Sequence, residues 1–409
     1  MRINLLNYSD YAGGSSRAVY RLHRGLLHFG QQSRLLVWEK YLADDTVYRL
    51  GPTESSRLAT YAQRAFNRMA AWRRRRALAG AESFFTWDSE APLGAEAVKR
   101  LPPADITHLH WISRFLRLDA LPALLAHRPA IWTLHDANLA YGGWHYEPSA
   151  GEITPAIAAE DKRLARRKRK LLGSIPAGRL VFVCPSQWLA ARISPIPEIG
   201  RHRIEVIANG VETDFFLPGN RASAREALGL PVNRPVLGFV AHSLADRRKG
   251  LQVLLQACAG MDAARRPVIL CAGGGTVTDP DVFSIGPQQS DFTLRLLYRA
   301  ADIFVCPSLQ DNLPNTILES LACGTPVVAS AVGGIPEAVG EGIGGSLVPP
   351  GDPDSLGVEI IRLLGNPRWL GQLAVSARER AVTLFSQRGQ AQRHIRLYEE
   401  LFEDGSPSP

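Results

Sequence analysis

Residues 302–330 read DIFVCPSLQDNLPNTILESLACGTPVVAS. The apolar runs at 302–306 and 326–329 are nearly continuous, which is typical of strands buried on both faces of a parallel sheet. Between them, a proline suited to a first helical turn and a glycine suited to a helix end predict a helix over residues 314–323. A strand, a helix and a second strand in this order predict a doubly wound α/β domain.

The same alternation extends over the rest of the chain. Phe182–Ser186, Phe-Val-Cys-Pro-Ser, recurs as Phe304–Ser308, and each copy ends a predicted strand with a proline. The repeat is consistent with two similar domains and also with a chance likeness of two strand ends. Further apolar runs predict strands at 2–6, 34–38, 106–112, 130–135, 179–184, 204–208, 235–241 and 267–271.

Turn signals at Asn209-Gly210 and Pro218-Gly219 suggest where the domains divide. We expect a first domain over residues 1–210 and a second over residues 211–386. An amphipathic helix over residues 387–403 is expected to complete the first domain, and residues 404–409 are expected to be a disordered tail.

Composition limits the class of protein. The chain has 409 residues, 45% of them hydrophobic and 21% charged, which excludes disordered, collagen-like and coiled-coil chains. Five cysteines without CxxC spacing argue against a disulfide scaffold and against a zinc site. No apolar run reaches the roughly 18 residues of a membrane helix, and no signal-peptide pattern opens the chain, so we expect a cytoplasmic protein.

Charge is unevenly distributed. The net charge is +8, and the residues before the predicted boundary carry +12 while those after it carry −4. Nucleic acid, an anionic membrane or a phosphorylated substrate would each suit a basic half, but no nucleic-acid recognition motif is present. Residues 162–170, KRLARRKRK, predict a basic amphipathic helix with Leu164 and Leu171 on one face, and Arg73–Arg76 add a second basic run. This helix would suit peripheral binding to the anionic inner membrane, or it could simply be a solvated helix packed by its leucines.

Four segments carry candidate chemistry. Gly13 and Gly14 follow a predicted strand and open a helix, where backbone N–H groups could bind an anion, although an ordinary tight turn would look the same. His135-Asp136 closes another strand and suits either a cleft or a structural role. His108 and His110 share one strand face, and we interpret them as lining core or cleft rather than binding metal.

The other two segments lie in the second half. Arg247-Arg248-Lys249 could neutralise a diphosphate, or be an exposed charged run. Asp311 is expected in the loop that enters the predicted helix and Glu319 midway along it, where two acids could surround a hydroxyl-rich, phosphate-bearing ligand.

Two Asp-Pro-Asp segments, at 279–281 and 352–354, spell the pattern of a divalent-metal ligand. Both stand among turn residues, and Asp354 could cap a helix. We therefore expect no metal site.

Together these motifs resemble retaining glycosyltransferases of family 4, which have the GT-B fold. The resemblance is strongest over residues 285–351, where Asp311 and Glu319 match an E-x7-E motif with Asp in place of the first Glu. The segments 110–112, 132–136 and 142–146 resemble a subgroup acting in capsule, exopolysaccharide and O-antigen synthesis. Further family-like segments are Leu297–Asp302, Cys306–Ser308, Ala322–Val328 and Gly333–Glu337.

The resemblance implies two Rossmann-like domains that face each other across a cleft, and transfer of a hexose from a UDP- or GDP-sugar to a glycan or lipid-diphosphate-linked glycan. It implies retention of configuration and neither a metal nor any cofactor besides the sugar nucleotide. The implied catalytic residues are Asp311, Glu319 and His135; the implied donor-binding residues are Gly13, Gly14, Arg247, Arg248, Lys249, Asn312, Leu313 and Glu319.

Individual roles follow from the same resemblance. Lys249 and a neighbouring Arg would stabilise the departing diphosphate, Glu319 would hold the ribose, and Asp311 with nearby backbone N–H groups would orient the donor sugar. Gly13 and Gly14 would approach the diphosphate, and His135 would contact the sugar. The family's phosphate-binding arginine is replaced by Leu244 or Ser243, so Arg247 or Arg248 is expected to substitute.

Two alternatives stay open at this point. A sugar-nucleotide epimerase of the same fold would need no separate acceptor, and a non-catalytic scaffold would bind the sugar nucleotide without turning it over.

Overall fold

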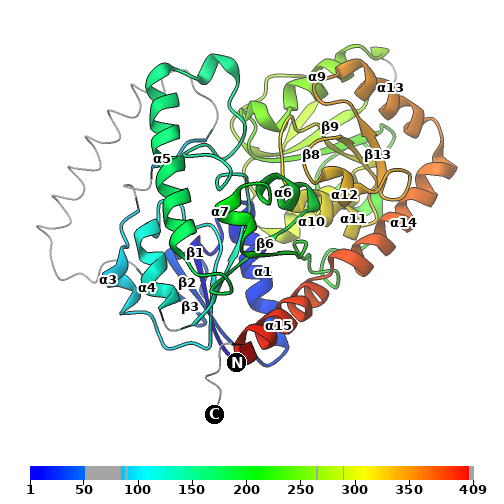
Figure 1. Ribbon diagram of the computed structural model, residues 1–409. Coiled ribbons are helices and arrows are strands. Elements are labelled where there is room, and N and C mark those ends of the chain that lie inside the picture. The colour runs from blue at the N-terminus through cyan, green and yellow to red at the C-terminus, as the bar shows by residue number, and fades with distance from the viewer. Residues whose placement is uncertain (51–83, 88–90, 127, 264–265, 289, 405–409) are drawn as a thin grey trace, which may run out of the picture. The chain divides into compact units, whose positions relative to one another are not determined.

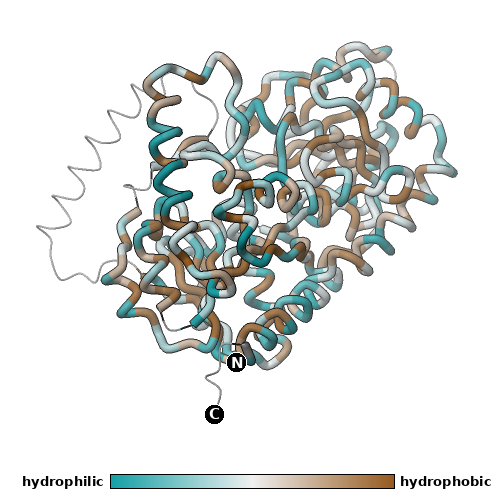
Figure 2. The backbone as a smooth tube through the Cα atoms, in the orientation of Figure 1, coloured by the Kyte–Doolittle hydropathy of each residue, from teal (hydrophilic) through white to brown (hydrophobic). Residues whose placement is uncertain are grey.

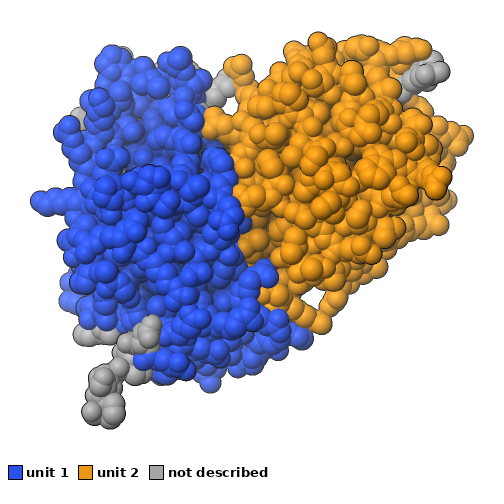
Figure 3. Space-filling model, turned by 45° about the vertical axis from the view of Figure 1, so that its right-hand side comes forward, with its two compact units in different colours: residues 1–207, 391–409 blue, residues 208–390 orange. Residues whose placement is uncertain are grey.

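The computed structural model describes residues 1–409 except 51–83, 88–90, 127, 264–265, 289 and 405–409. The basic run Arg73–Arg76 and nearly all of the expected tail therefore lie outside the described residues. The chain divides into unit 1, residues Met1–Ile207 with Ala391–Pro409, and unit 2, residues Ala208–Gln390 (Figure 3). The boundaries expected from the sequence, 210/211 and 386/387, lie within a few residues of these divisions.

Unit 1 contains a seven-stranded parallel sheet in the order β3-β2-β1-β4-β5-β6-β7 (Figure 1). Its strands are β1 (Arg2–Ser9), β2 (Gln32–Glu39), β3 (Val47–Arg49), β4 (Ile106–Leu109), β5 (Ala130–Thr133), β6 (Leu180–Cys184) and β7 (Arg203–Val206). Its helices are α1 (Gly14–His28), α3 (Ala95–Val98), α4 (Leu121–Leu125), α5 (Pro155–Ser174), α6 (Gln187–Ile193), α7 (Pro197–Gly200) and most of α15 (Gln387–Asp404).

Successive strand residues of unit 1 face two different cores, because side chains alternate along a strand. Ile131 packs with α1 and α15 on one face, among Leu22, Leu26 and Tyr398. Its neighbour Trp132 packs on the other face in the cluster that holds apolar residues of α4, α5 and α6. Both faces of the sheet are covered, as the continuous apolar runs predicted.

Unit 2 contains a six-stranded parallel sheet in the order β10-β9-β8-β11-β12-β13. Its strands are β8 (Val236–Ser243), β9 (Val268–Gly274), β10 (Val282–Ser284), β11 (Ile303–Cys306), β12 (Val327–Ser330) and β13 (Gly345–Val348). Its helices are α8 (Arg221–Ala227), α9 (Leu251–Ala259), α10 (Asp291–Ala300), α11 (Asn315–Ala322), α12 (Ile335–Val339), α13 (Pro353–Leu364) and α14 (Pro367–Phe385).

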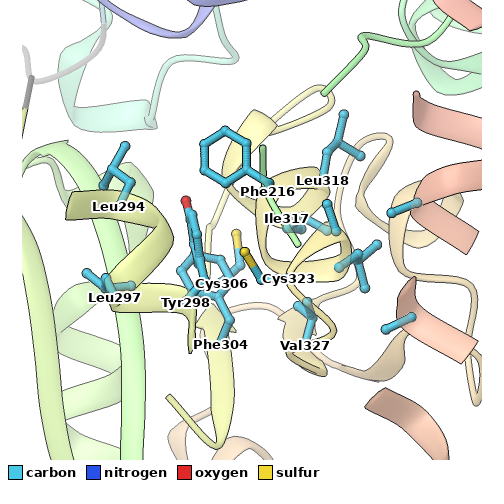
Figure 4. Packing of buried hydrophobic residues seen from close by; sticks show 14 of the residues in the cluster. Phe216, Leu294, Leu297, Tyr298, Phe304, Cys306, Ile317, Leu318, Cys323 and Val327 are labelled. Atoms are coloured by element: carbon cyan, nitrogen blue, oxygen red, sulfur yellow. The ribbon is translucent and has the colours of Figure 1, made fainter. Parts of the chain in front are cut away.

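The larger core of unit 2 lies under α10, α11 and α14, where Tyr298 stands among Leu294, Phe304 and Cys306 (Figure 4). The opposite face is packed by α9 and α13. Hydrophobic segments concentrate along the strands, whereas α5 is largely hydrophilic (Figure 2). Two α/β units with parallel sheets confirm the predicted fold class.

The differences from the sequence prediction are local. The short strands β3, β10 and β13 were not predicted, because three or four residues at a sheet edge carry little apolar pattern. Strands β4 and β5 end at Leu109 and Thr133, earlier than the apolar runs, so His110 and His135 lie just beyond the sheet.

Candidate functional site

The carboxyl ends of β8 and β11 bring a charged cluster together in unit 2. These two strands are neighbours, and the residues that follow parallel neighbours meet at one edge of the sheet. A short turn after β8 carries Lys249, and the loop after β11 carries Asp311. The Lys249 ammonium lies 2.5 Å from an Asp311 carboxylate oxygen. Two predicted donor-site residues, far apart in the chain, are thus in direct contact.

Glycines allow the backbone to approach closely around this pair. Gly333 has φ +57°, and a Cβ there would lie 1.7 Å from the carbonyl oxygen of Asp311. Gly250 has φ +74°, and its Cβ would lie 1.9 Å from the carbonyl of Pro307. Gly334 N–H also donates to the Asn312 carbonyl at 2.7 Å. Gly333 and Gly334 therefore support the path of the Asp311 loop.

The charge state of Asp311 depends on two opposing effects. Burial raises its pKa, but the cations of Lys249 and Arg248 and the Asn312 backbone N–H lower it more, so the pKa falls below its usual value. Asp311 is thus a buried carboxylate, 7% exposed, at neutral pH.

The two arginines of the charged turn differ in placement. Arg248 donates to the Gln310 carbonyl at 3.0 Å, pairs with Asp246 and lies 3.9 Å from Asp311. Arg247 is exposed. The geometry therefore brings Arg248 to the charged pair.

Glu319 lies midway along α11, as expected, with only 1% of its surface exposed. Its carboxylate accepts a 2.6 Å hydrogen bond from the Tyr298 hydroxyl of α10. Asn312 and Leu313 are buried in the loop before α11, and Leu313 packs into the larger core. Tyr298 was not predicted as a site residue, because only the packing of α10 on α11 brings it to Glu319.

In unit 1, β1 leads into the predicted glycine turn. Gly13 has φ +89° and directly precedes α1, which begins at Gly14. Asn7 braces this turn, since its amide donates to the Ser16 hydroxyl at 3.1 Å and its oxygen accepts from the Trp111 backbone N–H at 2.9 Å.

His135 lies beyond β5, with its Nε2 3.1 Å from Nδ1 of His110. Burial lowers the pKa of His135 to about 4, despite the opposing charge of Asp136, so the ring is neutral near pH 7. His108 is buried between the hydroxyls of Tyr398 and Thr133, each 2.7 Å away.

The partner of Asp136 was missed by the sequence analysis. Its Oδ2 lies 2.6 Å from Nδ1 of His145 and accepts from the Trp111 indole N–H at 3.1 Å. Both partners belong to segments singled out in the sequence, around residues 110–112 and 142–146. The sequence did not show these contacts, because local spacing gives no information on which loops lie close together after neighbouring strands.

The two Asp-Pro-Asp segments have structural roles. Asp352, not Asp354 as expected, caps α13 by accepting from the Ser355 backbone N–H at 3.0 Å. Asp281 pairs with Arg234 at 2.7 Å and with Arg266 at 3.3 Å. Within the described part of the chain, no three His, Cys, Asp or Glu side chains are grouped to hold a metal ion.

The predicted basic helix is α5, and one correction applies to it. Lys168 is buried and donates to the Asn138 backbone carbonyl at 2.8 Å and side-chain oxygen at 2.7 Å, so it is no surface cation. Leu164 and Leu172 face the core, whereas Leu171 is only partly buried. Of the helices in the described ranges, none has the length and apolarity to cross a membrane.

Comparisons with known proteins bear on both units. Relatives include D-inositol 3-phosphate glycosyltransferases of Nocardiopsis dassonvillei, 36% identical over 203 residues, and of Mycobacterium tuberculosis, 37% identical over 204 residues. These matches cover 44% and 45% of this chain and 47% and 41% of the relatives. The matched region thus spans less than half the length of these curated relatives.

Solved structures share the fold over nearly the whole chain. Sucrose-phosphate synthase from Thermosynechococcus elongatus has a TM-score of 0.70 at 21% identity, covering 99% of this chain and 100% of that one. Anabaena Alr3699/HepE in complex with UDP-glucose has a TM-score of 0.69 at 18% identity, covering 98% and 100%. The predicted GT-B architecture is confirmed by these likenesses, which at such identities concern the fold alone.

A family model gives the more specific match. Residues 234–366 match the model described as "Glycosyl transferases group 1". That segment carries Arg248, Lys249, Asp311 and Glu319, so the charged cluster of unit 2 lies within a region similar to group 1 glycosyl transferases.

Proposed function

We propose that this chain is a retaining glycosyltransferase that moves a hexose from a UDP- or GDP-sugar to a glycan or lipid-diphosphate-linked glycan in cell-surface polysaccharide synthesis. The observation that carries the proposal is the contact between Lys249 and Asp311 at the carboxyl ends of β8 and β11. A cation and a buried carboxylate side by side suit a donor with a diphosphate and a hydroxyl-rich sugar. Solved structures of a protein with a similar fold, in complex with UDP and with UDP-glucose, support this donor class.

In the proposed reaction, the bond between the anomeric carbon and the β-phosphate oxygen breaks as the acceptor hydroxyl oxygen bonds to the same face of that carbon. The acceptor proton passes to the departing phosphate oxygen. Lys249 and Arg248 stabilise the charge that grows on the diphosphate, and their fixed positions lower the cost of reorganisation. Asp311 orients sugar hydroxyls, and Glu319, held by Tyr298, accepts from the ribose hydroxyls.

The direct test incubates the chain with UDP-glucose or GDP-mannose, with and without acceptor. A transferase consumes the donor only when an acceptor is present, an epimerase interconverts sugars without one, and a scaffold shifts the thermal midpoint without turnover. Acceptor arms should include a lipid-diphosphate-linked sugar and an inositol phosphate, because the curated relatives are named as inositol 3-phosphate glycosyltransferases. Product NMR should show the donor's anomeric configuration.

We also propose that transfer needs no metal, on the strength of the family resemblance and the structural roles of Asp281 and Asp352. Full activity should survive EDTA. Abolition by EDTA with rescue by Mg²⁺ or Mn²⁺ would contradict this.

Peripheral binding to an anionic inner membrane is the remaining part of the proposal. The cations of α5 other than Lys168 are exposed, and cations near such a surface contribute about 1 kcal/mol each. Co-sedimentation with phosphatidylglycerol vesicles should fall with salt and with the double change Arg166→Ser and Arg167→Ser. The charge-matched control is Lys99→Ser with Arg100→Ser, exposed in the same unit. An equal loss of vesicle binding in the two double variants, or equal binding of the wild-type chain to neutral vesicles, would contradict the role of α5.

A further inference from the structure

Aromatic rings gather beyond the carboxyl ends of β1, β4 and β5 in unit 1. Tyr8 belongs to β1, Trp111 follows β4, and His145 lies in the loop after β5. The ring centroid of Trp111 lies 5.7 Å from that of Tyr8 and 5.9 Å from that of Phe84. The Phe84 ring in turn lies 4.7 Å from the His145 ring. Clustered aromatic rings at this edge of an α/β sheet are typical of a ligand site.

The backbone around Phe84 is fixed by the loop that follows β5. The Phe84 carbonyl accepts from the His145 backbone N–H at 3.1 Å, and the Thr86 backbone N–H donates to the Gly143 carbonyl at 2.9 Å. The Thr86 hydroxyl lies 2.9 Å from Nε2 of His145, whose Nδ1 lies 2.6 Å from the Asp136 carboxylate. Phe84 is therefore held in place while 38% of its surface stays exposed. An exposed ring on a fixed backbone is preorganised for stacking.

The Phe84 ring has Arg114 against it. The guanidinium carbon of Arg114 lies 4.8 Å from the centroid of the Phe84 ring. Within the described ranges, Arg114 is the only residue other than glycine with a positive φ, +61°. Residues in such conformations cluster at ligand sites, where the surrounding structure holds them. Arg114 is exposed, and an exposed cation–π contact is weak, so a ligand can displace the guanidinium from the ring.

Glu39 adds hydrogen-bond acceptors to the aromatic cluster. Its two carboxylate oxygens accept from the hydroxyls of Tyr8 at 2.7 Å and Tyr41 at 2.8 Å. A carboxylate offers about four lone-pair sites, so two tyrosines leave capacity for further hydroxyl donors. A sugar ring has C–H groups on its faces and hydroxyls around its rim, which suits an exposed aromatic ring with a carboxylate in the same cluster. The negative charge of Glu39 disfavours a phosphorylated ligand.

We infer that Phe84 is the stacking platform for a neutral sugar unit of the acceptor glycan. The sugar displaces the Arg114 guanidinium from the Phe84 ring, and hydroxyls of the same glycan donate to Glu39. The assignment to the acceptor rests on the proposed function, because the charged cluster proposed for the donor lies in unit 2. The inference selects a neutral glycan over an inositol phosphate as the acceptor.

The binding test uses the full chain with three neutral probes, methyl β-maltoside, methyl β-cellobioside and methyl β-lactoside. Saturation-transfer NMR should show at least one probe bound through the protons of one ring face. Phe84→Ala should weaken its Kd about tenfold, the loss of one stacking contact, whereas Phe84→Trp should retain binding. Arg114→Met should strengthen binding about threefold, because the competing cation is gone. Binding of none of the three probes by the wild-type chain would overturn the inference.

A matched control lies in the same unit. Phe402 is 36% exposed and has the Arg128 guanidinium carbon 5.3 Å from its ring, but Arg128 precedes β5 and so lies at the amino edge of the sheet. Phe402→Ala should leave glycoside binding unchanged, and an equal loss in Phe402→Ala and Phe84→Ala would refute a specific site. Inositol 3-phosphate is the opposing probe. Tighter binding of this probe than of the glycosides, lost in Arg114→Met, would show a phosphate site instead.

Transfer kinetics separate this inference from the proposed function. In Phe84→Ala, KM for a lipid-diphosphate-linked sugar should rise about tenfold, while KM for the sugar nucleotide and the thermal shift caused by UDP stay unchanged. A rise in the donor KM alone would overturn the assignment to the acceptor. If no sugar nucleotide is turned over, the transferase proposal fails, while the stacking of glycosides on Phe84 is still measured.

Discussion

The pentapeptide Phe-Val-Cys-Pro-Ser ends a strand in both units, but different structures follow it. In unit 1 it ends β6, and Ser186 at once caps α6 by accepting from the Leu189 backbone N–H at 3.1 Å. In unit 2 it ends β11, and residues 309–314 intervene before α11. Ser308 there donates to the Asp311 carboxylate at 3.4 Å instead of capping a helix. The same strand end yields a structural cap where the helix follows directly and a candidate site where a loop intervenes.

A second contrast lies in the chemistry of the strand ends. Unit 1 places buried neutral imidazoles there, whereas unit 2 places a buried carboxylate against a cation. Neutral rings position a ligand through directed hydrogen bonds, and charges stabilise developing charge. The loss of a charge in unit 2 should therefore reduce the reaction rate more than the loss of a ring in unit 1.

The largest expected effect is that of Lys249→Ala. Transfer should fall by about 10²–10³, because a preorganised charge contact to the leaving group is lost. The measurement is the steady-state rate with UDP-glucose or GDP-mannose, whichever the chain turns over. Lys99→Ala, an exposed change in unit 1, is the control and should retain full activity. A wild-type rate in a folded Lys249→Ala protein would remove the charged pair from the mechanism.

Gly333→Ala should damage the unit 2 loop next most strongly. Its Cβ would overlap the Asp311 carbonyl at φ +57°, so we expect a loss of about 3–4 kcal/mol in the free energy of unfolding and reduced transfer. The matched control is Gly342→Ala, at φ +72° with no atom within 4 Å of its Cβ, which should cost about 1–2 kcal/mol and leave activity unchanged. Denaturant unfolding measures both, and similar losses would show that the close approach to Asp311 is unimportant.

Acid should destabilise unit 1 before unit 2. Burial lowers the pKa of His23 in α1 to about 4, so below pH 6.5 the unfolded chain binds a proton that the folded chain excludes. Its contribution, about 3 kcal/mol, is complete above pH 6.5 and is lost as pH falls to about 4. Asp311 has a lowered pKa, so its contribution is lost only at pH values below the ordinary carboxylate range.

The order of acid unfolding can be measured by hydrogen exchange, read for each unit between pH 7 and pH 4. The only histidine in residues 208–390 is the exposed His242. Protection should therefore decrease first in unit 1. Earlier loss in unit 2 would show that charged pairs, not buried rings, limit stability in acid.

The smallest expected effect tests the repeated pentapeptide itself. Ser186→Ala should cost about 1 kcal/mol of stability, because a helix cap is lost, and leave transfer unchanged. Ser308→Ala should leave stability nearly unchanged and slow transfer a few-fold, because Asp311 loses one contact. Thermal midpoints and transfer rates should be measured for both variants. Ser186→Ala should lower the thermal midpoint and leave the rate unchanged, whereas Ser308→Ala should lower the rate and leave the midpoint nearly unchanged. The same response in both would show that the two serines have equivalent roles.

Much of the fold could be predicted from local sequence. Long buried strands show as continuous apolar runs because both of their faces are covered, and the helix predicted at 314–323 forms over Asn315–Ala322 because its start and stop residues are adjacent in the chain. Asp311 and Glu319 were also predicted, through a motif whose spacing within one loop and helix is local, and Lys249 was predicted from the charged run at residues 247–249.

What only the tertiary structure decided concerns partners that are distant in the chain. Four contacts depend on which strands and helices are neighbours: the pairing of Lys249 with Asp311, the approach of Arg248 to Asp311, the contact of Asp136 with His145 and the burial of Lys168. A sequence determines which segments must be buried, because burial follows from hydrophobicity along the chain. It does not show which polar groups meet at the sheet edge, because that depends on strand order and on loop paths set by packing.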